Sequence, residues 1–401
     1  MSHHAEARLD PLRASPNALA AHYSRFRVEE RLLLTGHSHQ AWPDVSFDGQ
    51  LEAWADAAEG VDEKWGRAEG KAERVRRGFA RLLGGRAEEI ALGQNTHELV
   101  IRLLSALPLA ARPRLVTTDG EFHTIRRQLD RLAEDGRLEV VKVAAYPAST
   151  LVERLVHAID DRTSAALVSS VLFETAHIVP GLDRALAACR ARGAELLVDA
   201  YHHLNVVPFS LDGLADAFVV GGGYKYCQLG EGNCFLRVPP GREGLRPLLT
   251  GWFSEFAHLT ERVPGRVAYG AGPARWSGAT YDPTSHYRAA SVFGFFEEMA
   301  LDPEFLRAVS RHQVTVLAER FDALDLDPGR IDRDREVPLE KVGGFLAFRA
   351  PEAARIAAML RERGMLTDHR GEWLRLGPAP YLSDGQLTAA VDLLGEAVRG
   401  L

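Results

Sequence analysis

The chain has 401 residues, of which 46% are hydrophobic and 26% charged, the balance of a globular protein with a large buried core. Its formal net charge of −7 argues against a general nucleic-acid-binding protein, because a phosphate backbone attracts a basic surface. Three scattered cysteines, no apolar N-terminal run and no apolar stretch of about 18 residues predict a cytoplasmic protein without disulfides, signal peptide or membrane span.

Residues 1–50 are predicted to form an N-terminal arm and loop, and residues 51–300 a large domain. This domain opens with helices rich in Ala, Arg and Glu over residues 51–83. Short apolar strands then alternate with amphipathic helices. Strands are predicted at 89–92, 114–118, 139–143, 164–169, 195–199 and 217–220, and helices at 125–134, 151–159 and 182–192. This order predicts an α/β fold in which a mostly parallel sheet carries helices on both faces.

Residues 301–401 are predicted to form a smaller C-terminal α+β domain. The segment before it, residues 269–283, is rich in Gly and Pro and is predicted to be a loop. Within the small domain, helices are predicted at 305–324 and 351–363 and strands at 343–348 and 373–376. Neither an internal repeat nor a low-complexity segment is present in the sequence.

Two charged residues follow neighbouring strands of the predicted sheet. Asp199 ends one strand, at the edge where open α/β sheets bind ligands, although a helix N-cap or a loop ion pair would explain an isolated aspartate. Lys225 follows Gly221–Gly223, whose backbone can turn sharply and approach a ligand; a surface lysine is the alternative. As a pair they predict pyridoxal 5′-phosphate, whose aldehyde needs a lysine and whose pyridine nitrogen needs a carboxylate.

Other strand ends offer the remaining parts of such a site. Asn95, Thr96 and His97 begin a predicted helix, where free N–H groups favour phosphate; a simple N-cap is equally compatible. Phe122 has an aromatic ring that suits stacking on a pyridine, or a place in the core. Arg375 offers a fork for a substrate carboxylate, or a structural ion pair. Cys-x-x-Cys spacing is absent, so no metal site is predicted.

From about residue 32 to residue 394 these motifs resemble kynureninase, a member of the class V aminotransferase group of fold-type I pyridoxal-phosphate enzymes. The loop Leu-Thr-Gly-His-Ser-His-Gln resembles the family's Gly-Asn-Ser-Leu-Gly loop and implies that Ser38 helps to bind substrate. Residues 89–100 resemble its Ile-Ala-Leu-Met-Asn motif, with Asn95 on the asparagine. Glu-Phe-His-Thr resembles its Phe-Pro-Thr/Ser-Asp motif, which implies that Phe122 stacks on the cofactor.

The later motifs extend the resemblance. Asp-Ala-Tyr-His resembles the family's Asp-Leu-Ala-His, and His202 is expected to support the phosphate or the aspartate. Tyr224 lies in the lysine motif and is expected to contact the phosphate, and Trp252 lies in a Gly-Trp motif that reaches the neighbouring subunit's cofactor. Arg375 is implied to bind the substrate's α-carboxylate. The family implies a seven-stranded sheet, a homodimer with shared active sites, and hydrolytic cleavage of a β–γ carbon bond that releases alanine.

Several positions depart from the kynureninase pattern. The family's early histidine is missing from residues 58–65, and Gly278 stands where an asparagine is expected. The substrate is therefore predicted as kynurenine or a related amino acid, while aminotransferase, lyase and epimerase chemistry stay open. A cysteine desulfurase is disfavoured because all three cysteines precede residue 235. A non-catalytic relative should lack the lysine or the aspartate, and a dehydrogenase should carry the G-x-G-x-x-G spacing.

Overall fold

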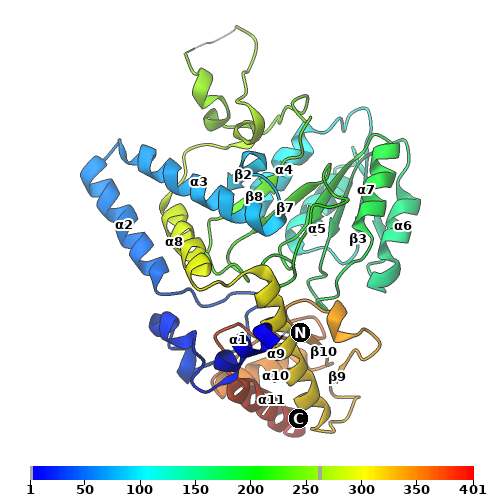
Figure 1. Ribbon diagram of the computed structural model, residues 1–401. Helices are drawn as coiled ribbons and strands as arrows, with labels where there is room; N and C mark the ends of the chain where they lie inside the picture. Colours follow the sequence, from blue (N-terminus) through cyan, green and yellow to red (C-terminus); the bar gives the residue numbers. More distant parts are fainter. Residues whose placement is uncertain (1–2, 261–263) are drawn as a thin grey trace.

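A mostly parallel sheet forms the centre of the computed structural model, which describes residues 3–260 and 264–401 (Figure 1). The order of its seven strands is β2 (Ile90–Gly93), β8 (Cys234–Arg237), β7 (Phe218–Gly222), β6 (Glu195–Asp199), β5 (Thr163–Ser169), β3 (Arg114–Thr118) and β4 (Glu139–Val143). The pairs from β7 to β4 are parallel, and β8 pairs antiparallel with both β7 and β2. The predicted fold class and seven-stranded sheet are confirmed.

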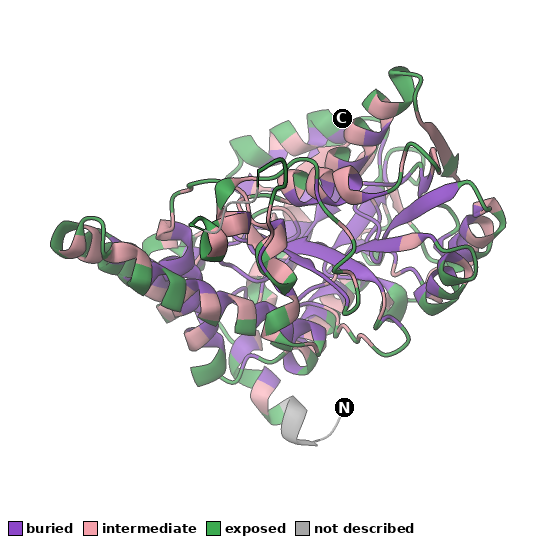
Figure 2. Ribbon diagram, turned by 90° about the horizontal axis from the view of Figure 1, so that it is seen from above, coloured by how far each residue is buried: buried purple, intermediate pink, exposed green. Residues whose placement is uncertain are grey.

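The central strands are apolar on both faces because helices cover both faces. In β6, Leu196 and Val198 face one core and Leu197 faces the other, and all three are almost completely buried. Each such side chain contributes roughly 1.5–3 kcal/mol when it leaves water. Figure 2 shows the buried strands between helices whose outer faces are exposed. The covering helices are α4 (Thr96–Ala106) and α5 (His123–Glu134) on one face, and α6 (Leu151–Ala158) and α7 (Leu182–Ala191) on the other.

Three long helices pack together, and one of them, α3, contacts the edge strand β2. The predicted helical region 51–83 is two helices, α2 (Val45–Gly60) and α3 (Lys64–Leu83), which break at Val61, a residue with a positive φ of 44°. Both contact α8 (Thr284–Glu298), which was not predicted (Figure 1).

Short 3-10 helices complete the connections: η1 (Ala20–Phe26), η2 (Val28–Glu30), η3 (Ala87–Glu89), η4 (Ala148–Thr150), η5 (Trp252–His258), η6 (Gly272–Trp276) and η7 (Leu339–Lys341).

The C-terminal unit is an antiparallel sheet covered by helices. Its strand order is β12 (Asp368–Arg370), β13 (Trp373–Leu376), β10 (Leu346–Arg349) and β9 (Asp332–Arg333). The helices are α9 (Pro303–Asp322), α10 (Ala353–Glu362) and α11 (Asp384–Arg399). A capping box of Ser383 and Gln386 starts α11 by satisfying its first N–H groups.

The N-terminal residues pack on this C-terminal unit. Strand β1 (Leu32–Leu33) pairs in parallel with β11 (Met365–Leu366), and α1 (His3–Arg13) contacts α9. Figure 1 shows α1 and α11 beside α9. The loop that contains Ser38 is thereby held between the large sheet and the small unit. Across residues 3–260 and 264–401, no helix combines the length and the apolar character that crossing a membrane requires.

Candidate active site

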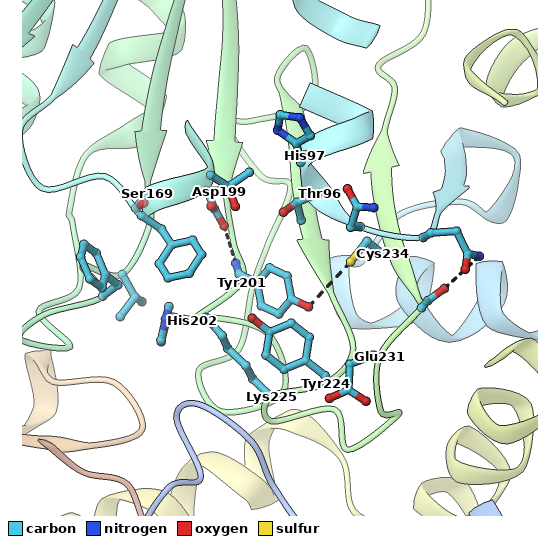
Figure 3. Close-up of a pocket in the computed structure, with 17 residues that line it drawn as sticks. Thr96, His97, Ser169, Asp199, Tyr201, His202, Tyr224, Lys225, Glu231 and Cys234 are labelled. Atoms are coloured by element: carbon cyan, nitrogen blue, oxygen red, sulfur yellow. Dashed lines mark hydrogen bonds between the residues drawn. The ribbon is translucent and has the colours of Figure 1, made fainter. Parts of the chain in front are cut away.

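A cavity of about 260 Å³ lies where β5, β6 and β7 end, next to the start of α4 (Figure 3). Parallel strands bring their carboxyl ends to one edge, so residues far apart in the sequence meet there. Its lining residues are Gln94, Asn95, Thr96, His97, Phe122, Thr124, Ser169, Val171, Phe173, Asp199, Tyr201, His202, Tyr224, Lys225, Glu231, Gly232 and Cys234. Eight of the predicted site residues are among them.

Lys225 is buried at this edge, with only 4% of its surface exposed. Its Nζ lies 4.6 Å from the ring centre of Tyr201 and 5.0 Å from that of Phe122. Burial disfavours the charged amine and lowers the pKa of Lys225 to about 7. The only hydrogen-bond partner recorded for Nζ in the described residues is His202 Nε2, at 2.7 Å. Burial also holds the pKa of His202 well below its usual range, so this imidazole is neutral and pairs with Lys225 through a hydrogen bond.

Asp199 is held in place by the backbone that follows it. The N–H of Tyr201 donates to Asp199 Oδ1 at 2.8 Å, as Figure 3 shows, and this bond leaves the second oxygen for a ligand. Burial raises the pKa of the Asp199 carboxyl, and the charge of Lys225 opposes that rise. Because Ser169 is paired with Asp199 across β5 and β6, its side chain also reaches the cavity.

The glycines before Lys225 have a different role from the predicted one. Gly221 and Gly222 lie inside β7, and none of Gly221–Gly223 has a positive φ. Instead, side chains fill the space in front of them. A Cβ atom on Gly222 would lie 2.4 Å from Tyr201 Oη, and one on Gly223 would lie 2.6 Å from Leu229 Cδ1. Glycine is needed here because neighbouring side chains pack against the backbone, and no sharp turn requires it.

The start of α4 combines an N-cap with backbone donors that have no partner inside the helix. Asn95 Oδ1 accepts from the N–H of Glu98 at 2.9 Å, and Asn95 Nδ2 donates to Glu98 Oε1 at 3.2 Å. The N–H groups of Thr96 and His97 lie in the first turn, where no intrahelical acceptor exists, and both residues line the cavity. The N–H of Thr96 faces the thiol of Cys234. The helix therefore presents donors and a positive dipole end to an anion.

Phe122 precedes α5, and a buried acid anchors the turn that carries it. Its ring meets Phe173 edge-on, with centres 5.5 Å apart. The neighbouring Glu121 is 1% exposed, and its carboxyl oxygens accept from the hydroxyls of Thr118 at 2.7 Å and Ser169 at 2.6 Å. Burial raises the pKa of Glu121 to about 7. Sequence reasoning missed Glu121, although it is an acidic residue three positions beyond the end of a buried strand.

Three predicted residues do not line the cavity. Ser38 Oγ is 3.0 Å from His39 Nδ1, and it is His39 that reaches the rim by stacking on Tyr224. Trp252 is 45% exposed and donates to Thr280 Oγ1 at 3.2 Å. Its predicted contact with a neighbouring subunit stays a prediction. Ser38 keeps a substrate-binding role only as a prediction as well.

Arg375 forms an ion pair in the position where a substrate carboxylate was expected. Its Nε and Nη2 donate to the two oxygens of Asp368 at 3.0 and 2.6 Å, and Nη1 donates to the carbonyl of Phe173 at 2.5 Å. Asp368 Oδ1 also accepts a hydrogen bond from Nε2 of the fully buried His37, at 2.7 Å. The fork of Arg375 therefore already holds one carboxylate.

The cavity provides groups that fit pyridoxal 5′-phosphate. Lys225 is a buried amine for the aldehyde, Asp199 is a carboxylate for the pyridine nitrogen, and Phe122 presents a flat face. The start of α4 suits the phosphate. Within the described residues, His202 Nδ1 is buried without a hydrogen-bond partner, which marks it as a polar atom that a ligand oxygen could satisfy.

Known proteins with similar sequences agree with this fit. No protein-family model matches the chain. It is 27% identical to isopenicillin N epimerase of Streptomyces clavuligerus, over 81% of this chain and 84% of that protein. It is 28% identical to kynureninase of Deinococcus radiodurans, over 80% of this chain and 76% of that protein. The predicted resemblance to kynureninases is confirmed by these matches.

Solved structures share the whole fold. The cystine C–S lyase C-DES, solved as a mutant with glycine linked to its pyridoxal-phosphate cofactor, has a TM-score of 0.81 at 14% identity. The alignment covers 94% of this chain and 98% of that one. A cysteine desulfurase from Thermococcus onnurineus has a TM-score of 0.76 at 17% identity, over 93% and 96% of the two chains. At these identities the match establishes the fold.

Proposed function

We propose that this chain, a relative of the kynureninases with the fold of class V pyridoxal-phosphate enzymes, binds pyridoxal 5′-phosphate through Lys225 and transforms an amino acid. The observation that supports this most is the buried Lys225, whose pKa is lowered to about 7, in one cavity with Asp199. An amine with this pKa is a nucleophile and a base near neutral pH, whereas an ordinary surface lysine stays charged.

Each residue of the cavity has an expected task toward the cofactor. When bound, pyridoxal phosphate supplies an aldehyde that links to amines and a ring that withdraws electrons from the substrate's α-carbon. We expect Asp199 to keep the pyridine nitrogen protonated and Phe122 to lie on the ring. The N–H groups of Thr96 and His97, with Tyr224, would hold the phosphate.

Proton transfer is the task of Lys225, and His202 orients its amine. Once the substrate's amine is bound, the freed amine of Lys225 can take the α-proton and return it elsewhere. His202 Nε2 lies 2.7 Å from Lys225 Nζ and holds the amine by a hydrogen bond. Because the pKa of His202 lies well below its usual range, the imidazole stays neutral, and the proton stays on Lys225 until it is delivered to the substrate.

For the reaction we propose hydrolytic cleavage of the β–γ carbon bond of kynurenine or a related substrate. Water is consumed, the bond between the β-carbon and the γ-carbonyl breaks, and alanine leaves with the carboxylic acid formed from the carbonyl. The relatives named kynureninase support this choice. Gly278 stands where the family has an asparagine, and a side chain there would require the end of Arg102 to move, since a Cβ would lie 2.3 Å from Arg102 Nη2. The substrate is therefore proposed to be kynurenine or a related amino acid that differs from it at the end far from the α-carbon.

Epimerisation is the second candidate. The relative named isopenicillin N epimerase aligns over 346 residues, and the same lysine can remove and return an α-proton. Aminotransferase chemistry would use these residues too, and a relative from Bacillus subtilis carries the name of an uncharacterised aminotransferase. The products separate the three reactions: alanine, the inverted amino acid, or a keto acid.

A homodimer with shared active sites is part of the proposal. The segment around η5 exposes four large apolar side chains: Leu248 at 83%, Leu249 at 53%, Trp252 at 45% and Phe256 at 60%. Exposed apolar side chains that gather in one segment favour contact with another protein surface. We expect a second copy of the chain to cover them, so that Trp252 lies beside the partner's cavity. A monomer by light scattering at micromolar concentration would contradict the shared site.

A product screen tests the function. The purified chain is saturated with pyridoxal phosphate and incubated with kynurenine, 3-hydroxykynurenine and other amino acids, and alanine, inverted product and keto acid are measured. Lys225→Ala should bind no cofactor covalently and release no alanine, while Lys341→Ala, an exposed lysine of the small unit, serves as the matched control. If the wild type gains no visible absorbance with pyridoxal phosphate, or if Lys225→Ala still turns over, the proposal fails.

A further inference from the structure

Tyr201 brings a second aromatic ring into the cavity beside Lys225. It lies two residues past the end of β6, and 7% of its surface is exposed. Its ring centre is 4.6 Å from Lys225 Nζ and 5.0 Å from the ring centre of Tyr224. A ring this close to the reacting amine will contact any flat group that is attached to that amine.

Phe122 approaches the same amine from another part of the fold. Phe122 comes from the turn before α5, whereas Tyr201 follows β6. The recorded ring contacts of Phe122 are with His123 and Phe173, and that of Tyr201 is with Tyr224. In the described part of the chain, the two rings therefore line one cavity without contacting each other, and Lys225 Nζ lies within about 5 Å of both.

The phenol of Tyr201 is fixed at the back of the cavity. Its Oη is 3.7 Å from Cys234 Sγ, and Figure 3 shows this contact running away from Lys225. The ring lies against Gly222, where a Cβ atom would come within 2.4 Å of Oη. Burial holds the pKa of Tyr201 well above its usual value, so the phenol keeps its proton and does not serve as a base. What it offers a ligand is the face of its ring.

We infer that Tyr201 is a positioning residue that forms the second aromatic wall of the slot beside Lys225, so that a bound pyridine ring is held between Phe122 and Tyr201. This inference rests on the proposed function, since it assumes that the ligand is pyridoxal phosphate. Stacking on two faces fixes the plane of the ring and favours offset aromatic contact on each side. The backbone N–H of Tyr201 also orients Asp199. Tyr201 therefore fixes both the plane of the pyridine ring and the position of the carboxylate expected to bind its nitrogen.

Two substitutions separate the ring of Tyr201 from its hydroxyl. Tyr201→Leu removes the flat face, and Tyr201→Phe keeps it while losing the contact to Cys234. Dissociation constants for pyridoxal phosphate are measured by equilibrium dialysis, together with the absorbance maximum of the bound cofactor. We expect Tyr201→Leu to weaken binding about two- to tenfold and to shift the absorbance maximum, the scale of one aromatic stacking contact. Tyr201→Phe should match the wild type in both.

Thermal unfolding of both variants guards against a folding artefact. If Tyr201→Leu does not fold, Tyr201→Met is measured in its place, since a flexible side chain fills the space without a ring. A folded variant without the ring that binds the cofactor with wild-type affinity and absorbance overturns the inference, and so does a Tyr201→Phe variant that is as weak as Tyr201→Leu. A wild type that does not bind pyridoxal phosphate at all instead overturns the proposed function.

Discussion

The lowered pKa of Lys225 predicts how fast the protein takes up its cofactor at different pH values. Only the neutral amine attacks an aldehyde, so the rate of attachment follows the neutral fraction of Lys225. Burial among Phe122, Tyr201 and His202 lowers the pKa of Lys225 to about 7, while the charge of Asp199 partly opposes this shift. The attachment rate should therefore rise with pH and level off just above neutrality.

The size of the effect follows from the titration. With a pKa of about 7, roughly 10% of the amine is neutral at pH 6, half at pH 7 and about 90% at pH 8. The rate should increase about tenfold from pH 6 to pH 8 and by less than about a fifth from pH 8 to pH 10. A lysine with an ordinary pKa of about 10.4 would gain roughly tenfold for each pH unit over that whole range.

The assay mixes the cofactor-free protein with excess pyridoxal phosphate in a stopped-flow spectrometer and follows visible absorbance between pH 5.5 and pH 10. The control is the reaction of acetyl-lysine amide with pyridoxal phosphate. Its rate is first divided by the neutral fraction of its own amine, whose pKa is about 10.4, and then reports the titration of the cofactor itself. Dividing the protein's profile by this corrected control leaves the contribution of Lys225. A corrected rate that still climbs tenfold per unit above pH 8 would refute the account of a buried, neutralised lysine.

Three further substitutions test other parts of the site. Asp199→Asn should keep the cofactor but reduce kcat about a hundredfold in the product screen, since one charge-stabilising group is lost; unchanged kcat contradicts its role. Asp368→Asn should lower the free energy of unfolding by about 2 kcal/mol in urea, because the buried Arg375 loses its counter-charge. Asn95→Ala should lower the midpoint of thermal unfolding by the equivalent of about 1 kcal/mol, the cost of an N-cap; an unchanged midpoint speaks against capping.

The sheet could be predicted well because its strands are buried on both faces. Three predicted large-domain strands, 114–118, 139–143 and 195–199, match the structure residue for residue. Strand β8 was missed because Cys234–Arg237 is a short antiparallel segment between loops, and its apolar run of three residues, Cys-Phe-Leu, is too short to distinguish a strand from a buried loop. Helix α8 was missed for a related reason: it is buried nearly all round, so its sequence lacks the amphipathic period that marks a surface helix.

The site could be predicted where residues follow the ends of parallel strands, since the sheet itself brings those ends together. Asp199, Lys225, Phe122 and Thr96 all line the cavity for this reason. Tyr201 was missed although it lies two residues past a predicted strand. The direction of its side chain depends on the backbone after the strand ends, and the space in front of Gly222 that receives its ring is set by the pairing of β7 and β8, which the sequence does not show.

The ion pair of Arg375 could not be predicted because it depends on strand register. Asp368 in β12 lies directly opposite Arg375 in β13, and the sequence does not show that the two strands pair in this register.

The ion pair between Asp368 and Arg375 changes the net charge that a substrate carboxylate would encounter. Burial lowers the pKa of His37 to about 4, so His37 is neutral at pH 7 and adds no charge. Arg370 Nη1 lies 3.3 Å from Asp368 Oδ2, so the group of Arg370, Arg375 and Asp368 carries a net charge of +1. If a substrate carboxylate binds beside Arg375, as the resemblance to kynureninase implies, it would complete the charge balance while Asp368 stays in place. Asp368→Asn raises the net charge to +2, so this one substitution should weaken the fold while lowering KM for an amino-acid substrate. A raised KM in the folded variant would mean that Asp368 is needed to aim Arg375.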